Sequence, residues 1–173
     1  HNPRYAGAEA RTAEYAQGGK GAWEPLAGGL PDVYIAMGQT AENVATYKGV
    51  SREEQDEFAA LSQQRATASL ENGFWEAEIT PVVTTDDEGN EVTVTRDDGI
   101  RPGTTAEGLA GLKPAFRPDG TVTAGNACPL NDGAAAVIVM SDTRAAELGL
   151  TPLARIVSSG VSGLDPEIMG LGP

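Results

Sequence analysis

The chain has 173 residues, and 40% of them are hydrophobic, which is enough for the core of one ordinary domain or two small ones. A net charge of −13 repels nucleic-acid phosphates and anionic lipid surfaces, so neither is an expected partner. The chain has one cysteine and one histidine, His1, so neither an internal disulfide nor a metal cluster of these residues is expected. No apolar run reaches the roughly 20 residues of a membrane span. We expect a cytoplasmic protein without membrane insertion.

The first third of the chain is predicted to contain two short helices. Residues 8–16 (AEARTAEYA) form the first, and a turn-prone segment over residues 18–32 follows it without any sign of chemistry. Ala41, Val44 and Ala45 recur on one face of the second helix, and Gly49 can close it.

A longer helix is predicted over residues 51–72. Ser51 followed by Glu54 is a capping box, and Asn72-Gly73 is a strong stop signal. The side chains of Phe58, Leu61 and Ala68 supply the apolar stripe that would face the core.

The second half of the chain changes to strand-like patterns. β-branched residues in 78–83 and 91–96 flank an acidic turn and predict an exposed hairpin, and residues 105–112 are prone to form a helix. The apolar runs 134–141 and 152–163 are predicted as buried strands on either side of a helix. Such a unit leaves sheet edges unpaired, and residues 1–128 do not obviously supply partner strands.

Cys128 is a weak candidate for a nucleophile. A reactive thiolate needs a base or another group that lowers its pKa, and the chain has no internal histidine. We therefore expect a small buried or cleft-lining thiol, and a cysteine hydrolase built on Cys128 is disfavoured.

Charged side chains offer two further candidates. The acidic pairs Glu53 and Glu54, Asp86 and Asp87, and Asp97 and Asp98 lie in hydrophilic helix starts or turns, where a solvated surface role is expected. A group of basic residues could instead form a positive patch for an anionic ligand, or serve in structural ion pairs: Arg96, Arg101, Lys113 and Arg117.

Four stretches, in this order and spacing, closely resemble the thiolase family of acetyl-CoA C-acyltransferases. They are MGQTAENVA, SREEQDEFAALSQQRA, LKPAFRPDGTVTAGNACPLNDGAAAVIVMSD and RIVSSGVSGLDPEIMGLGP. The resemblance extends from about residue 30 to the end of the chain and implies an α/β thiolase fold. By this resemblance, residues 1–128 correspond to the loop domain that covers coenzyme A, 129–152 to the end of the N-terminal core half, and 153–173 to the start of the C-terminal half.

The resemblance also implies a function for a longer parent protein. Thiolases transfer acyl groups between 3-oxoacyl-CoA or acetyl-CoA and coenzyme A, which is a substrate, with no other cofactor, and they generally form dimers and often tetramers. Their Cys-x-Ser-Gly, Asn-Glu-Ala-Phe, Gly-His-Pro and Cys-x-Gly motifs do not occur in this sequence, so we expect the chain alone to be inactive. Ala36, where short-chain biosynthetic members often carry His, favours the degradative type, as in fatty-acid β-oxidation.

Seven residues match family positions beside coenzyme A. Met37 and Met169 match positions that flank the pantetheine arm, and Arg101 matches one beside the nucleotide. The other four match positions along the loop that contacts the ligand: Phe116, Ala124, Ala127 and Cys128. Two departures weaken polar contacts, because Cys128 is often Ser in the family and Gly108 replaces a Ser near the adenine.

An alternative of a different class remains open at this point. The chain could be a complete, non-catalytic acyl-CoA binding or lipid-transfer module. The isolated strand–helix–strand unit disfavours it, since that unit needs neighbouring strands.

Overall fold

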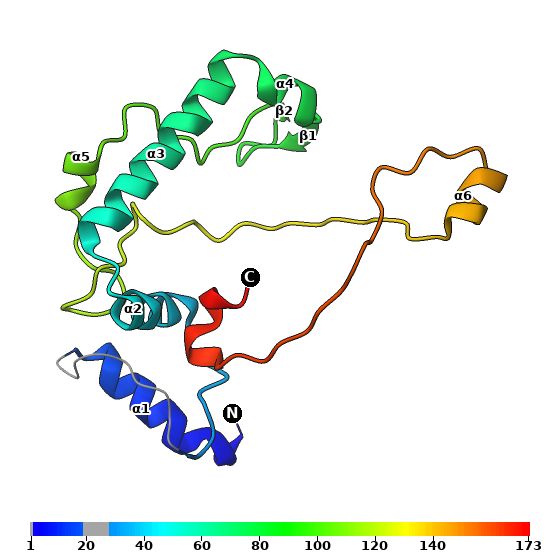
Figure 1. Ribbon diagram of the computed structural model, residues 1–173. Helices are drawn as coiled ribbons and strands as arrows, with labels where there is room; N and C mark the ends of the chain where they lie inside the picture. The colour runs from blue at the N-terminus through cyan, green and yellow to red at the C-terminus, as the bar shows by residue number, and fades with distance from the viewer. Residues whose placement is uncertain (1, 19–27) are drawn as a thin grey trace. The chain divides into compact units, whose positions relative to one another are not determined.

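The computed structural model of the protein describes residues 2–18 and 28–173 (Figure 1). His1 and part of the turn-prone segment, residues 19–27, lie outside the described residues. The chain divides into two units: the described residues up to Pro129 together with Leu164–Pro173, and Leu130–Gly163.

The first unit begins with a short 3-10 helix, η1 (Pro3–Tyr5), which continues directly into α1 (Ala6–Ala16). The prediction of a helix over 8–16 is therefore confirmed. The second predicted helix is α2 (Met37–Lys48), and it ends at Gly49, whose φ of 68° is the left-handed conformation that glycine adopts without strain.

The buried face of α2 is polar, and the predicted apolar face is wrong. Ala41 is exposed, and Val44 and Ala45 are only half-buried. The residues of α2 that are buried are Gln39, Thr40, Glu42 and Asn43. They face segments that present backbone N–H and C=O groups, which need hydrogen-bond partners when they leave water.

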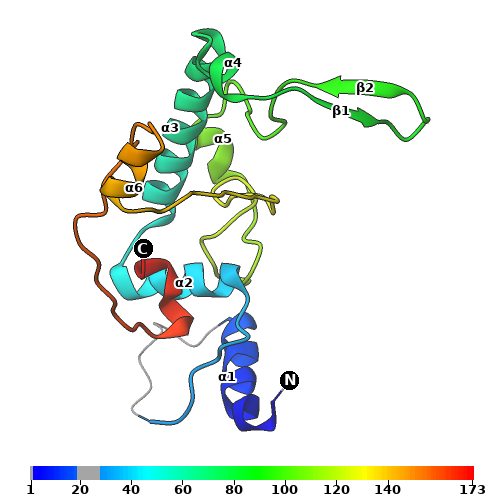
Figure 2. The ribbon, with the colours of Figure 1, turned by 90° about the vertical axis from the view of Figure 1, so that its right-hand side faces the viewer.

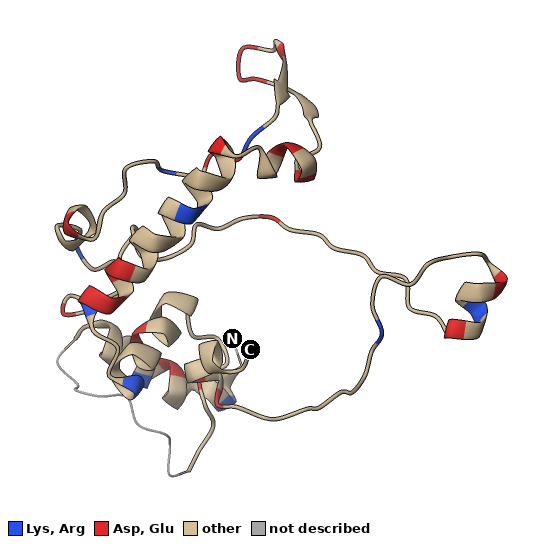
Figure 3. Cartoon of the chain, turned by 45° about the horizontal axis from the view of Figure 1, so that its top comes forward, with Lys and Arg blue, Asp and Glu red and all other residues tan. Residues whose placement is uncertain are grey.

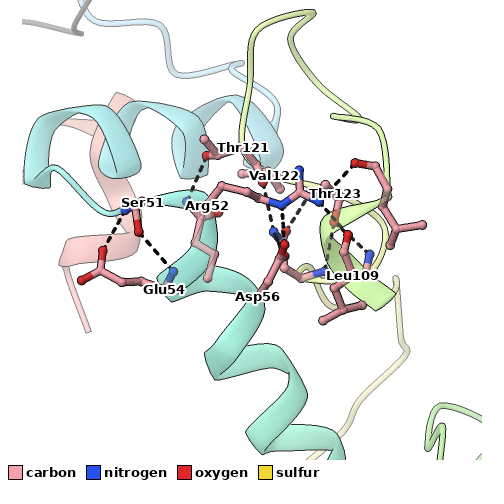
Figure 4. A network of polar contacts seen from close by, with 12 residues as sticks. Ser51, Arg52, Glu54, Asp56, Leu109, Thr121, Val122 and Thr123 are labelled. Carbon is pink, nitrogen blue, oxygen red and sulfur yellow. Dashed lines mark hydrogen bonds and ion pairs between the residues drawn. The ribbon is translucent and has the colours of Figure 1, made fainter. Parts of the chain in front are cut away.

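Helix α3 (Arg52–Glu71) confirms the capping box. The Ser51 Oγ accepts a hydrogen bond from the Glu54 backbone N–H at 3.1 Å, and the Ser51 N–H donates to Glu54 Oε2 at 2.8 Å (Figure 4). These bonds hold the pKa of Glu54 below its ordinary value. The predicted apolar stripe is wrong: Phe58 is 72% exposed, and Leu61 and Ala68 are exposed. The residues of α3 that are buried are Asp56 and Ala60.

A short helix that was not predicted, α4 (Phe74–Glu78), follows α3 and leads into the hairpin. Strands β1 (Val82–Thr85) and β2 (Glu91–Val94) pair antiparallel, with Val82 opposite Val94 (Figure 2). The Asp86 carboxylate accepts bonds from Glu88 N at 3.0 Å and Asn90 N at 2.8 Å, which closes the turn and lowers the pKa of Asp86, chiefly through Asn90. The predicted exposed hairpin is confirmed.

Two short elements complete the first unit. Helix α5 (Ala106–Ala110), within the predicted 105–112, starts at Thr105, whose Oγ1 accepts from Gly108 N at 3.1 Å, and it packs on α3. The 3-10 helix η2 (Pro166–Leu171) lies beside α2 although more than 100 residues separate them in sequence (Figure 1).

The second unit contains α6 (Asp142–Glu147), which confirms the helix predicted there. The two predicted buried strands are wrong: residues 134–141 and 152–163 form no strand and are exposed, with Ile138 at 87% and Val157 at 88%. A strand exists only through hydrogen bonds to a neighbour, and the described residues provide none for these segments.

No helix among residues 2–18 and 28–173 is long and apolar enough to cross a membrane. In the same residues, no cluster of three or more His, Cys, Asp or Glu side chains could hold a metal ion. Figure 3 shows that acidic residues are spread along the helices and at the hairpin turn, and the three acidic pairs singled out in the sequence are all exposed, as expected.

Candidate functional site

The candidate site is built around the segment GTVTAGNAC, residues 120–128, which we call the GTVTAGN loop. Its first part is fixed by Glu42 of α2, whose side chain is almost fully buried. The Glu42 carboxylate accepts hydrogen bonds from Thr121 N at 3.0 Å and Val122 N at 2.9 Å, and from the Thr121 hydroxyl at 3.2 Å. One buried charge thus satisfies two backbone donors of the loop.

The second part of the GTVTAGN loop is fixed by Asp56 of α3, which is 2% exposed. Asn126 Nδ2 donates to Asp56 Oδ1 at 2.9 Å and to the Thr121 carbonyl at 3.0 Å. The Thr123 N–H donates to Asn126 Oδ1 at 2.7 Å, which closes the loop on itself. Figure 4 shows Asp56 close to Arg52 and to Thr121–Thr123 of the loop.

Arg52 joins this network to α5. Its Nε lies 2.6 Å from Asp56 Oδ2, and its Nη2 donates to the carbonyls of Leu109 at 2.7 Å and Leu112 at 3.1 Å (Figure 4). The guanidinium therefore pairs with a buried carboxylate and also satisfies carbonyl groups at the C-terminal end of α5.

Two glycines permit the close contacts of the GTVTAGN loop. A Cβ on Gly120 would overlap the Glu42 carboxylate, and a Cβ on Gly125 would lie 2.5 Å from the side chains of Leu109 and Leu112. The loop backbone can reach its anchors only where side chains are absent.

Ala124, Ala127 and Cys128 lie on the exposed side of this anchored loop. Of the two environments expected for Cys128, the buried one is therefore wrong, and a cleft-lining position stays a prediction. The structure presents small side chains to solvent from a backbone segment that two buried carboxylates fix.

Phe116 and Met37 lie near the start of α2. The Phe116 ring lies against Gly38, where an added Cβ would overlap it, and the Phe116 carbonyl accepts from Gln39 Nε2 at 2.7 Å. Met37 is the first residue of α2 and is 58% exposed. Met169 belongs to η2, which packs on α2, and it is also exposed.

Arg101 lies at a different place in the unit. Its backbone N–H donates to Gln63 Oε1 at 2.8 Å, so the segment before α5 is attached to α3, and its side chain is exposed. The contacts of the described residues connect the α2 region with the GTVTAGN loop, but they do not bring Arg101 to either.

The predicted positive patch loses one of its members. Arg117 is buried, and its guanidinium donates to Gln39 Oε1 at 2.8 Å and Asn43 Oδ1 at 2.5 Å and lies over the Tyr15 ring. Burial lowers the pKa of Arg117, against the opposing effect of the charges of Glu42 and Asp119. Its role is structural, whereas Arg96, Arg101 and Lys113 are exposed.

Two surface hollows flank the end of α2 in the first unit. One is lined in part by Glu42, Arg117 and Thr121, and the other in part by Lys48, Phe58 and Asn126. None of the seven residues matched to coenzyme A contacts lines either of them. Sequence reasoning missed Glu42 and Asp56, because a carboxylate in an acidic protein gives no signal of burial before its distant partners are known.

Comparison with known proteins identifies the family. The sequence matches the model described as thiolase, N-terminal domain, over residues 8–143. The chain belongs to the thiolase family. This confirms the resemblance carried by the GTVTAGN loop and its flanking stretches.

Individual thiolases are similar to this chain at about half of the aligned positions. This chain is 56% identical over 137 residues to acetyl-CoA acetyltransferase of Pseudomonas aeruginosa, and the alignment covers 79% of this chain and 35% of that protein. It is 53% identical over 146 residues to the human peroxisomal 3-ketoacyl-CoA thiolase, and that alignment covers 82% of this chain and 34% of that protein.

Solved structures agree on the fold. The crystal structure of Bacillus anthracis acetyl-CoA acetyltransferase superposes with a TM-score of 0.72 at 50% identity, over 83% of this chain and 36% of that one. The human mitochondrial 3-ketoacyl-CoA thiolase superposes with a TM-score of 0.71 at 47% identity, over 82% of this chain and 35% of that one. The thiolase fold is thus confirmed, and the chain spans about a third of the length of the thiolases that it matches.

Proposed function

We propose that the chain is part of a thiolase that transfers acyl groups between 3-oxoacyl-CoA and coenzyme A, and that it supplies a wall of the coenzyme A site. The observation that carries the proposal is the GTVTAGN loop, fixed by Glu42 and Asp56, with Ala124, Ala127 and Cys128 exposed along it. Small side chains allow a long, thin ligand to approach the backbone closely.

The remaining matched residues have parts in the same proposal. Met37, Phe116 and Met169 would contribute apolar surface beside the pantetheine arm, and Arg101 would pair with phosphate at the nucleotide end. Met37 and Phe116 belong to one region at the start of α2, which supports a shared surface.

The chemical step in this proposal belongs to residues outside the chain. In thiolysis an enzyme thiolate attacks the 3-oxo carbonyl, the bond between C2 and C3 breaks, and C2 takes up a proton so that acetyl-CoA leaves. The thiol of coenzyme A then attacks the acyl-enzyme thioester, which releases the shortened acyl-CoA and restores the enzyme thiol. Hydrogen-bond donors stabilise the oxyanions that form in both steps. Cys128 is not assigned to that step, since the sequence has no internal histidine to act as its base. The wall contributes by binding and orienting coenzyme A, which lowers the entropic cost of bringing its thiol to the carbonyl of the acyl-enzyme thioester.

The direction, compartment and assembly are further parts of the proposal. Ala36 favours the degradative, 3-oxoacyl-CoA-cleaving type, as in fatty-acid β-oxidation. A cytoplasmic location and a dimer or tetramer of the full-length protein remain predictions from the sequence.

The test is a thiolysis assay on the full-length protein and on the 173-residue chain. With a 3-oxoacyl-CoA and coenzyme A, the full-length protein should release acetyl-CoA and the shortened acyl-CoA, whereas the chain alone should show no turnover. Turnover by the chain alone would contradict the placement of the catalytic residues outside it. No turnover by the full-length protein would contradict the proposed reaction.

A further inference from the structure

We infer that Glu42 and Asp56 are positioning residues for coenzyme A, acting through the GTVTAGN loop and without touching the ligand. This inference rests on the proposed function and adds two residues to it. Both side chains are at most 3% exposed and lie on different helices, α2 and α3. Each fixes one part of the same loop.

The bonds that these carboxylates make bracket the exposed residues of the loop. Glu42 holds the backbone N–H groups of Thr121 and Val122, before Ala124, and Asp56 holds Asn126, which follows Ala124 and directly precedes Ala127. The loop contains no helix or strand of its own between these points. An antiparallel bridge between Pro114 and Thr123, with a hydrogen bond from Ala115 N to the Val122 carbonyl at 2.9 Å, holds its first part. The two carboxylates fix the loop together with this backbone contact.

The two carboxylates meet a loop that is buried at its start and exposed further on, since Val122 is 5% exposed and Thr123 is fully buried. Burying a carboxylate is unfavourable unless hydrogen bonds compensate for the lost water. Here the compensating donors are groups of the loop and, for Asp56, also the guanidinium of Arg52. Ala124, Ala127 and Cys128 are exposed and add no buried apolar area. A fixed backbone at an exposed, small-residue surface is what a site for a slender ligand requires, because a preformed wall loses little conformational entropy on binding.

The glycines of the loop support the same inference. Gly120 leaves the space that the Glu42 carboxylate occupies, and Gly125 lets the backbone pack against Leu109 and Leu112 of the α5 region. Residues without side chains thus stand at two of the points where the loop meets its anchors.

The test uses Glu42→Gln and Asp56→Asn in the full-length protein, with Glu57→Gln as the matched control. Glu57 is exposed, lies on α3 beside Asp56 and loses the same charge. Each substitution keeps the size of the side chain and one acceptor oxygen, but the amide NH2 that replaces the second oxygen cannot accept a hydrogen bond. Each side chain therefore loses at least one of the hydrogen bonds that its carboxylate accepts. Thiolysis is measured with coenzyme A and with pantetheine, which lacks the nucleotide.

The expected result is a rise in KM for both thiols on the order of tenfold, with kcat changed by less than about twofold. Both thiols should be affected because the loop faces the arm that they share. Glu57→Gln should leave both constants unchanged. An unchanged KM in an active protein, with only a lower melting temperature or a lower kcat, would overturn the inference and show a structural role alone.

A second variant keeps the test decisive if a buried substitution prevents folding. Asn126 is half-buried, and Asn126→Ala removes the link between the loop and Asp56 without changing the buried carboxylate. It should raise KM for both thiols in the same way, and an unchanged KM would overturn the inference. Absence of thiolysis in the wild-type protein is a distinct outcome, which contradicts the proposed reaction itself.

Discussion

Replacing Arg52 with Met should open the contact between α3 and α5. The substitution keeps the aliphatic part of the side chain but removes the ion pair with Asp56 and the bonds to two carbonyls at the end of α5. Asp56 remains buried and keeps only its bond from Asn126. Leaving a buried carboxylate without its partner should lower the free energy of opening this contact by about 3 kcal/mol. This value is at the lower end for buried ion pairs, because the Arg52 side chain is 19% exposed.

A loss of this size should raise the equilibrium for local opening on the order of a hundredfold. Hydrogen exchange followed by mass spectrometry, on peptides that cover residues 105–126 of the full-length protein, reports that opening directly. Peptides of the β1–β2 hairpin provide the internal control, because no contact of Arg52 reaches them.

A double-mutant cycle separates the ion pair from other effects. Asp56→Asn alone should lower the free energy of opening by less than Arg52→Met does. In the double variant the decrease should be at least about 1 kcal/mol smaller than the sum of the decreases in the two single variants. Exchange in Arg52→Met that stays within about twofold of wild type, or strict additivity in the cycle, would refute this account of the network.

Three other substitutions test separate parts of the structure. Gly38→Ala places a Cβ inside the Phe116 ring, so the ring must move. The KM for coenzyme A should then rise about fivefold with little change in kcat. An unchanged KM would remove Phe116 from the site. Two hydrogen bonds of Ser51 hold the folded-state pKa of Glu54 below its ordinary value: the larger effect comes from the backbone N–H, which Ser51→Ala keeps, and the smaller from the side chain, which it removes. Ser51→Ala should therefore raise the pKa of Glu54 partway to its ordinary value in an NMR titration, and an unmoved pKa would remove the Ser51 side chain from the causes. The stabilisation exists above the unfolded-state pKa and is lost as pH falls through the folded value, so the variant should lose less stability on acidification than wild type. Arg101→Ala should raise KM for coenzyme A about tenfold but leave KM for pantetheine unchanged, and equal effects on both would place Arg101 away from the nucleotide.

Local features of the fold could be predicted from the sequence because their causes lie within a few residues. The capping box of Ser51 and Glu54, the left-handed Gly49 at the end of α2 and the turn at Asp86 all depend on neighbours in sequence. These signals fixed the helix starts, the helix ends and the hairpin.

The buried faces could not be predicted in the same way. Apolar spacing selected Phe58 and Leu61 of α3, but the structure buries Asp56 and Ala60. The reason is that the GTVTAGN loop, about 70 residues away in sequence, meets α3 through hydrogen bonds and not through apolar packing. Nothing local to α3 specifies that partner.

The segments 134–141 and 152–163 show a different limit. Their composition predicts buried strands, yet they are extended and exposed, because pairing requires neighbours that the described residues do not contain. For the site, family resemblance supplied the residues of the loop, whereas only the structure revealed Glu42 and Asp56 as the side chains that fix it.

The central claim, that coenzyme A lies along the GTVTAGN loop, is tested most directly by the alkylation rate of Cys128. This thiol is exposed at the end of the loop, and peptide mass spectrometry of the full-length protein distinguishes it from other cysteines. Saturating desulfo-coenzyme A, which keeps the pantetheine arm but has no thiol to consume the reagent, should slow the reaction of Cys128 with iodoacetamide at least about tenfold, whereas adenosine, which lacks the arm, should not. Equal alkylation rates with and without desulfo-coenzyme A would contradict the claim.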